Sequence, residues 1–143
     1  MVGMGILAPV VALAAWTSVM LLWMYATRIP AMRALKLDLD RMVRDPEARL
    51  DKLLPPEIQW KSHNYNHLHE APTVFYAVAI VLAIVGQGDG YNLWLGWLYV
   101  GLRIAHSLVQ ATINRIMLRF AIFAVSSLVL IVLTGRAAWA LWW

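Results

Sequence analysis

The chain has 143 residues, of which 62% are hydrophobic and only 14% are charged, and its net charge is +4. A soluble domain of this size has no interior large enough to bury so much apolar surface, so the composition excludes an ordinary soluble protein. The chain contains no cysteine, which excludes a disulfide framework and any thiolate supplied by the protein itself. The composition therefore favours a membrane protein.

Four apolar segments are each long enough to cross a bilayer, which takes about 20 helical residues. The sequence predicts a loop at about 28–59 and membrane helices at about 5–26, 60–86, 91–112 and 117–141. The first segment lacks the basic start of a signal peptide and stays apolar beyond the length of one, so we interpret it as a retained helix. The expected fold class is all-α, an integral membrane four-helix bundle formed by one domain over residues 1–143.

Basic residues gather in the loops that should face the cytoplasm. The connection between helices three and four carries Arg115 and Arg119, whereas residues 87–90 carry only Asp89. Eight of the twelve basic residues lie between helices one and two: Arg28, Arg33, Lys36, Arg41, Arg44, Arg49, Lys52 and Lys61. Because short loops rich in Lys and Arg stay in the cytoplasm, both loops are predicted there and both termini on the other side, where the C-terminal tryptophans suit an interfacial belt.

The long connector between helices one and two is interpreted as a solvated, interfacial segment. Its eight bases against six acids leave only +2, which argues against a nucleic-acid partner. Asp45-Pro46-Glu47 has the order of an N-cap, a first-position proline and an acidic first turn, and leucines follow at helical spacing. A short amphipathic helix is therefore predicted there, ending at Pro55-Pro56.

Polar residues recur at helical spacing along helices two and three. On helix two this stripe comprises His63, Asn66, His67 and Glu70. On helix three it comprises Arg103, His106, Gln110 and Asn114. Ionisable groups are expensive in hydrocarbon and mark functional sites unless they are partnered, so we predict that Glu70 and Arg103 pair between the two helices. Arg115 and Arg119 would close the same site from the start of helix four.

These residues could also serve the structure alone, without binding a ligand. A buried Glu–Arg pair can simply hold two helices together, and Arg115 and Arg119 can simply follow the positive-inside rule. Three histidines beside Glu70, at positions 63, 67 and 69, also resemble a metal cluster. His69 points off the shared face, however, and nearby arginines would repel a dication, so no metal is predicted. The convergence of carboxylate, amide, imidazole and guanidinium groups favours a zwitterionic ligand with several carboxylates.

Two motifs carry a resemblance to a known family. Asn66-x-x-x-Glu70-x-Pro72-x-x-Phe75-Tyr76 follows a long basic loop, and Arg103-x-x-His106-Ser107 precedes two arginines that open the fourth helix. This pattern resembles the MAPEG superfamily (membrane-associated proteins in eicosanoid and glutathione metabolism), in its bacterial branch, over nearly the whole chain. The resemblance implies a homotrimer of four-helix subunits in the inner membrane, with glutathione bound between subunits near the cytoplasmic face.

The resemblance also implies a role for each site residue. Arg119 would be catalytic, because an adjacent guanidinium favours the thiolate form of glutathione. Other arginines would hold the glutathione carboxylates, Glu70 would receive the ammonium group or a backbone amide of glutathione, and a lipophilic electrophile would arrive from the surrounding lipid. The predicted glutathione-binding residues are Arg28, Lys61, His63, Asn66, Glu70, Arg103, His106, Gln110 and Arg115.

Three positions depart from the family's pattern. His67 stands three residues before Glu70, where many members have asparagine. Gln110 takes the place of the tyrosine of conjugating members, and Phe120 that of the serine found in prostaglandin-synthase relatives. A non-catalytic membrane scaffold or accessory subunit therefore stays open beside the glutathione transferase-like enzyme. A transporter is a third reading, less favoured because the sequence shows no repeats or broken-helix signals.

Overall fold

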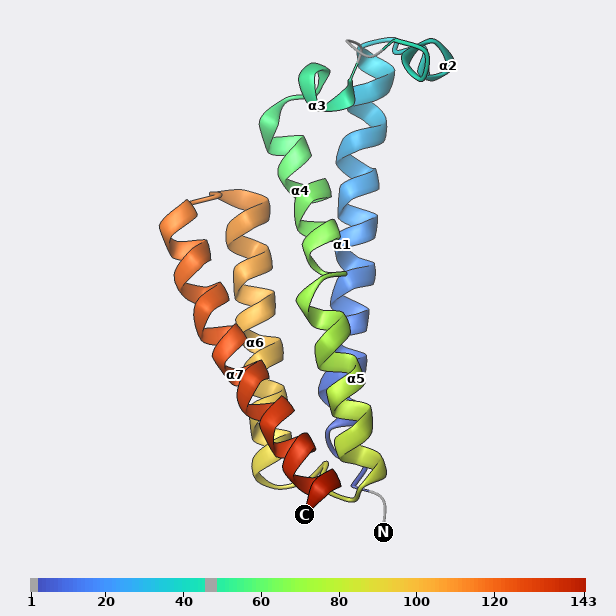
Figure 1. Cartoon of the computed structure of the whole chain (residues 1–143). Coiled ribbons are helices and arrows are strands. Elements are labelled where there is room, and N and C mark those ends of the chain that lie inside the picture. The colour runs from blue at the N-terminus through green and yellow to red at the C-terminus, as the bar shows by residue number, and fades with distance from the viewer. Residues whose placement is uncertain (1–2, 46–48) are drawn as a thin grey trace.

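The structure is a computed structural model that describes residues 3–45 and 49–143. Within these residues every regular element is a helix, which confirms the predicted all-α class. The helices are α1 (Leu7–Ala34), α2 (Leu39–Met42), α3 (Leu50–Leu53), α4 (Pro56–His67), α5 (Ala71–Ile84), α6 (Tyr91–Thr112) and α7 (Ile116–Trp142). Figure 1 shows the long helices side by side, with both termini at one end of the molecule and α2 and α3 at the other.

Three helical spans are long and apolar enough to cross a membrane: Leu7–Ala34, Pro56–Ile84 and Ile116–Trp142. The predicted fourth span, α6, is not among them, because polar residues such as Arg103 lower its mean hydropathy. It still has 22 residues and packs against α1, α4 and α7. Within the described residues, three apolar spans are therefore established.

The first helix is longer than predicted. It was expected to end near residue 26, with Arg28 in the loop, but α1 continues to Ala34 and includes Arg28. Alanine, methionine and arginine in this stretch are good helix formers, so the helix extends beyond its apolar part. It ends where Lys36 adopts a left-handed conformation, with φ of 48°, a usual way to stop a helix.

The second predicted helix, at 60–86, is broken into α4 and α5 at residues 68–70. Pro72 lies in the first turn of α5 and has no N–H to donate to the carbonyl of Leu68, and its ring would clash with that carbonyl in a continuous helix. The structure therefore interrupts the single helix predicted at 60–86, although Pro56–Ile84 is still one apolar span. The break also means that the polar residues on either side of it do not share one helical face.

The short connector helix is present as α3, which begins one residue after its N-cap, Arg49. The predicted N-terminal signal, Asp45-Pro46-Glu47, lies partly outside the described residues, because positions 46–48 are not described. Leu54, which follows α3, is buried. Leu54 thus packs toward the rest of the protein, whereas Leu53 is exposed.

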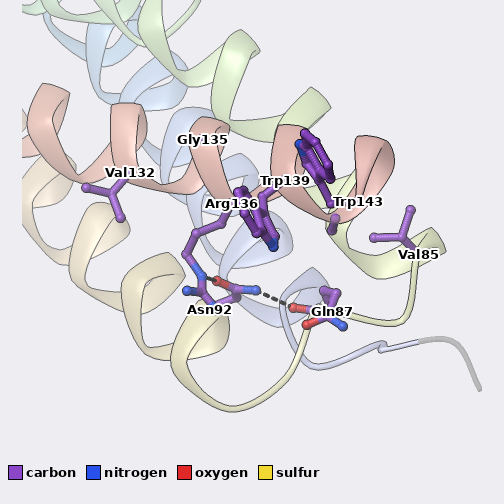
Figure 2. Close-up of a pocket in the computed structure, with 9 residues that line it drawn as sticks. Val85, Gln87, Asn92, Val132, Gly135, Arg136, Trp139 and Trp143 are labelled. Atoms are coloured by element: carbon purple, nitrogen blue, oxygen red, sulfur yellow. Dashed lines mark hydrogen bonds between the residues drawn. The ribbon is translucent and has the colours of Figure 1, made fainter.

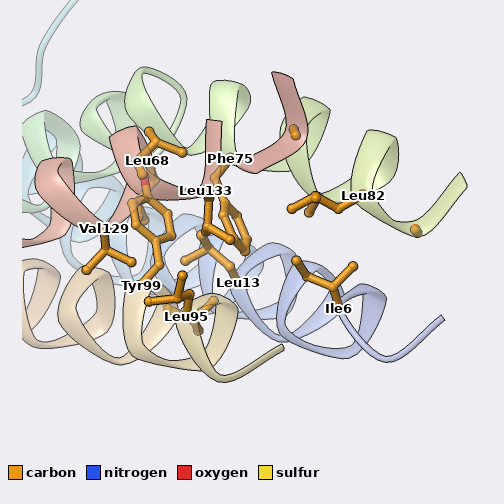
Figure 3. Packing of buried hydrophobic residues seen from close by; sticks show 14 of the residues in the cluster. Ile6, Leu13, Leu68, Phe75, Leu82, Leu95, Tyr99, Val129 and Leu133 are labelled. Atoms are coloured by element: carbon orange, nitrogen blue, oxygen red, sulfur yellow. The ribbon is translucent and has the colours of Figure 1, made fainter. Parts of the chain in front are cut away.

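Apolar side chains fill the space between the helices, as Figure 3 shows. Leu13 of α1, Phe75 of α5, Tyr99 of α6 and Leu133 of α7 are each fully buried. The rings of Phe75 and Tyr99 stack with their centres 4.5 Å apart. We call these four residues the apolar layer; it holds four helices together next to the candidate site.

Candidate functional site

A set of polar side chains is buried between α4 and α6, next to the apolar layer. On α6 they recur three or four residues apart, so they lie on the one face that packs against the other helices. This polar layer comprises Asn64, Arg103, His106, Ser107 and Gln110. Buried polar groups require hydrogen-bond partners. Members of the polar layer that have partners within the protein serve the fold, and members without them are candidates for binding a ligand.

Ser107 joins three helices within the polar layer. Its Oγ accepts a hydrogen bond of 2.6 Å from Nδ2 of Asn64 on α4. It also accepts one of 2.9 Å from Nε1 of Trp16 on α1. These bonds satisfy the serine, and they fix the relative positions of α1, α4 and α6. This part of the polar layer is structural.

Arg103 is only 1% exposed, and most of its hydrogen-bonding groups lack a partner. Its Nη2 donates to the carbonyl of His67, 3.2 Å away, at the end of α4. Nε and Nη1 have no hydrogen-bond partner within the described chain. The guanidinium carbon lies 5.8 Å from the ring centre of Phe123. A buried cation without an ion-pair partner in the described chain is costly for the fold, so this arrangement is suited to an anionic ligand.

The predicted pair of Glu70 and Arg103 does not form. Between these two described residues the structure has no ion pair within 4.0 Å, and the Glu70 side chain is 62% exposed. The helix break at 68–70 places Glu70 at the N-cap of α5, where its side chain is exposed. Oε2 of Glu70 lies instead 3.0 Å from Nδ1 of His67. The angles there are not those of a hydrogen bond, so the contact is an ion pair only when His67 is protonated.

Arg119 lies in a small cavity beside the polar layer. One of its terminal nitrogens, Nη1, donates to the side-chain oxygen of Asn114, which has a left-handed backbone with φ of 47°. Its Nε is buried and has no partner among the residues described. The cavity has a volume of about 200 Å³ and is lined by His67, His106, Ile116, Arg119, Phe120 and Phe123. It combines two imidazoles and a guanidinium with apolar walls.

Of the other predicted residues, His106 and Gln110 lie in the polar layer, and Oε1 of Gln110 has no partner among described residues. Arg28 donates from Nη1 to Oγ of Ser62. Lys61 lies over the ring of Trp23, with Nζ 5.3 Å from its centre. The rest are exposed on this single chain and do not reach the cavity: His63, Asn66, Glu70 and Arg115.

The predicted site residues omitted two members of the polar layer and, among the residues that line the cavity, His67 and the apolar Ile116, Phe120 and Phe123. His67 lines the cavity, with its ring centre 5.9 Å from that of His106. Asn64 and Ser107 belong to the polar layer but had no predicted role. Helical spacing offered a signal for both, because Ser107 follows Arg103 by four residues and Asn64 precedes His67 by three.

The described residues offer no support for a metal centre. Among residues 3–45 and 49–143, no three His, Cys, Asp or Glu side chains come together in a way that could hold a metal ion. Nδ1 of His69 lies 2.9 Å from the carbonyl of Tyr65, so this imidazole is bonded to the backbone of α4.

Comparison with known proteins supplies the family. The model of the MAPEG family matches residues 6–139, which is nearly the whole chain. No curated protein and no solved structure matches it. The family match agrees with the three apolar spans and points to a glutathione-related function at a membrane. The chain belongs to the MAPEG family and is an integral membrane protein.

Proposed function

We propose that the chain binds glutathione in the membrane and acts as a glutathione S-transferase or peroxidase-like enzyme on lipophilic electrophiles. The observation that carries this proposal is the buried guanidinium of Arg103, with Nε and Nη1 unpartnered within the described chain. The nitrogens of Arg103 thus form a site for a carboxylate group, and Arg119, which has a third unpartnered nitrogen nearby, is left to face the sulfur. Such groups bind carboxylates in charge-assisted hydrogen bonds, and glutathione carries two carboxylates.

The cavity alone is too small for the whole ligand, which supports an assembly of subunits. Small-molecule pockets usually measure about 300–1,000 Å³, whereas this one measures about 200 Å³. His63, Asn66 and Glu70 lie exposed on the apolar span that α4 and α5 form, where polar groups should not face lipid. In our proposal a neighbouring copy covers these residues and completes the site. The proposed assembly is a homotrimer.

The subunit we propose is a four-helix bundle in which α6 is the fourth membrane span. Its 22 residues reach about 33 Å, enough to cross the hydrocarbon core. Its polar face lies against the other helices rather than outward, because Arg103, His106, Ser107 and Gln110 are all buried. Low hydropathy is therefore compatible with a span whose polar side is covered by protein.

The orientation follows from the basic residues. In Figure 1 the connection between α6 and α7 lies toward the same end as the long connector with α2 and α3. Both segments are rich in Lys and Arg, so we propose that this end faces the cytoplasm. The bacterial branch of the family and the inner membrane complete this proposal, with the cavity opening on the cytoplasmic side.

Each chain residue has a defined task in the proposed reaction. Bound glutathione supplies the thiol, whose thiolate form is the nucleophile. Arg103 holds a carboxylate through its unpartnered nitrogens, and Glu70 at the exposed rim accepts the ammonium group. Arg119 stabilises negative charge at the sulfur without having to move, because Asn114 already holds its side chain. Phe120 and Ile116 are exposed apolar walls of the cavity, where a lipophilic electrophile can enter from lipid.

Calorimetry tests binding on the detergent-purified protein. Glutathione should bind with a stoichiometry of one site per subunit or fewer, and S-hexylglutathione should compete. Turnover of 1-chloro-2,4-dinitrobenzene with glutathione then tests catalysis. Protein that is folded by circular dichroism yet binds no glutathione would contradict the proposal.

A second candidate is a non-catalytic membrane scaffold that keeps the ligand site. Gln110 favours it, because a buried amide stands where the conjugating members carry a tyrosine. The bonds that link Ser107 to Asn64 and Trp16 likewise serve packing alone. Glutathione binding without any turnover would select this candidate over the enzyme.

A further inference from the structure

A second pocket lies at the opposite end of the helices from the polar layer. It has a volume of about 590 Å³ and lies between the end of α5, the start of α6 and the end of α7 (Figure 2). Arg136 in this pocket and Arg119 in the cavity are 17 residues apart on α7, or about 25 Å along the helix. The two sites are therefore separate, and this pocket has no part in the proposed glutathione chemistry.

The guanidinium group of Arg136 lies in this pocket and is held in place by hydrogen bonds. Nε of Arg136 donates to the side-chain oxygen of Asn92, which is only 2% exposed. Nδ2 of Asn92 donates in turn to the carbonyl of Gln87, 2.7 Å away, as Figure 2 shows. The guanidinium carbon also lies 5.1 Å from the ring centre of Tyr91. These contacts orient the guanidinium of Arg136 in advance of any ligand.

The charge of Arg136 has no counterpart in the described part of the chain. No ion pair between described residues involves Arg136. Its terminal nitrogens, unlike Nε, have no hydrogen-bond partner among the described residues. The acid of the nearby loop, Asp89, accepts a hydrogen bond of 3.0 Å from the backbone N–H of Gly5. The terminal nitrogens of Arg136 therefore remain available for an anion.

The rest of the pocket is apolar and lies at the level of a membrane interface. Val132 and Trp139 line it, and the rings of Trp139 and Trp143 stack with centres 5.8 Å apart. Tryptophans at the end of a membrane helix mark the boundary between lipid tails and headgroups. Gly135 leaves part of this space open, because a Cβ added there would have no atom within 4 Å.

We propose that this pocket binds a membrane phospholipid. Its phosphate contacts the terminal nitrogens of Arg136, and the first part of an acyl chain lies against Val132 and Trp139. An oriented guanidinium is the best protein partner for a phosphate, because it donates two parallel hydrogen bonds. A cation at the interface with an apolar slot toward the lipid tails fits a headgroup and chain together better than either alone.

Native mass spectrometry of the full chain in mild detergent measures how much lipid the protein retains. This experiment tests whether the charge of Arg136 binds the phosphate. Dioleoylphosphatidylglycerol is the probe, dioleoylglycerol is the same lipid without phosphate, and glycerol phosphate is the headgroup without chains. The parent should retain the phospholipid but neither of the other two. Arg136→Gln should lower retention about tenfold or more, the scale of losing a charge-assisted hydrogen bond. Arg44→Gln, which removes an exposed charge in the connector, should retain as much lipid as the parent.

A second pair of variants tests the pocket without touching Arg136. Gly135→Leu fills the open space, and Gly101→Leu places the same side chain on α6, where a Cβ also meets no atom within 4 Å. The first should lose the phospholipid and the second should keep it. Equal retention in both variants, equal retention of dioleoylglycerol, or binding of glycerol phosphate as tight as that of the phospholipid would each overturn the proposal. If Arg136→Gln does not fold, the glycine pair alone decides.

Discussion

The apolar layer and the polar layer are neighbours on α6 but differ in what they bury: stacked aromatic rings in one and a charged guanidinium in the other, although the Tyr99 hydroxyl also lacks a partner in the described chain. Tyr99 and Arg103 are four residues apart, so they lie on one face a single turn from each other. The Tyr99 ring is fully buried and stacks on Phe75. Arg103 is equally buried, yet two of its nitrogens lack a partner in the described chain. The apolar layer therefore provides stability, whereas Arg103 is placed at a cost to the fold that a bound anion would offset.

Removing a ring from the apolar layer should give the largest effect. Phe75→Ala leaves a cavity beside Tyr99 and should lower the free energy of unfolding by about 3–5 kcal/mol. Val74→Ala, at the exposed neighbouring position, is the control and should change it little. Unfolding of both variants in detergent by denaturant titration compares them. Similar losses in the two would show that the layer does not carry the stability assigned to it.

The next effect concerns catalysis at Arg119. Arg119→Leu should lower turnover of 1-chloro-2,4-dinitrobenzene by about 10² or more, the scale of deleting one charge-stabilising group. Glutathione affinity should stay within a few fold, because other residues hold the carboxylates. Arg115→Leu removes an exposed arginine one turn away and should leave turnover near that of the parent. Equal losses in both variants would contradict a specific role for Arg119.

The structural part of the polar layer should respond differently from its ligand-binding part. Ser107→Ala removes the acceptor of two buried donors, on Asn64 and Trp16, and should cost about 1–3 kcal/mol of stability. Ser127→Ala removes only a bond to the carbonyl of Phe123 within α7 and should cost far less. Thermal unfolding measures both. A Ser107→Ala variant as stable as the parent would show that these two hydrogen bonds do not stabilise the fold.

The smallest effect is expected at Glu70. Glu70→Gln removes an exposed carboxylate whose contact is His67, so it should change stability by less than about 1 kcal/mol. A buried pair with Arg103 would instead cost about 3–5 kcal/mol on losing its acid. Denaturant titration in detergent distinguishes the two. A loss in the larger range would mean that Glu70 does neutralise Arg103 in the assembled protein.

The sequence predicts the helical class and the key buried cation because both depend on local composition. Apolar runs of about 20 residues locate the spans, and an arginine inside such a run indicates a polar site. Local composition did not predict the path of the chain around Glu70. The helix predicted over 60–86 includes Pro72, and the break that this proline introduces leaves Glu70 exposed. Asn64 and Ser107 were missed although their helical spacing offered a signal, because single small polar residues are common in membrane helices and do not by themselves indicate a site.

Glutathione calorimetry on Arg103→Met, with unfolding measured on the same preparation, tests most directly whether Arg103 anchors the ligand. Methionine keeps much of the side-chain volume but removes the unpartnered charge, so the variant should unfold no more easily than the parent. It should bind glutathione about tenfold or more weakly, because the carboxylate loses its charged donors. A variant that binds glutathione as tightly as the parent would contradict the assignment of Arg103 as the buried anchor of the ligand.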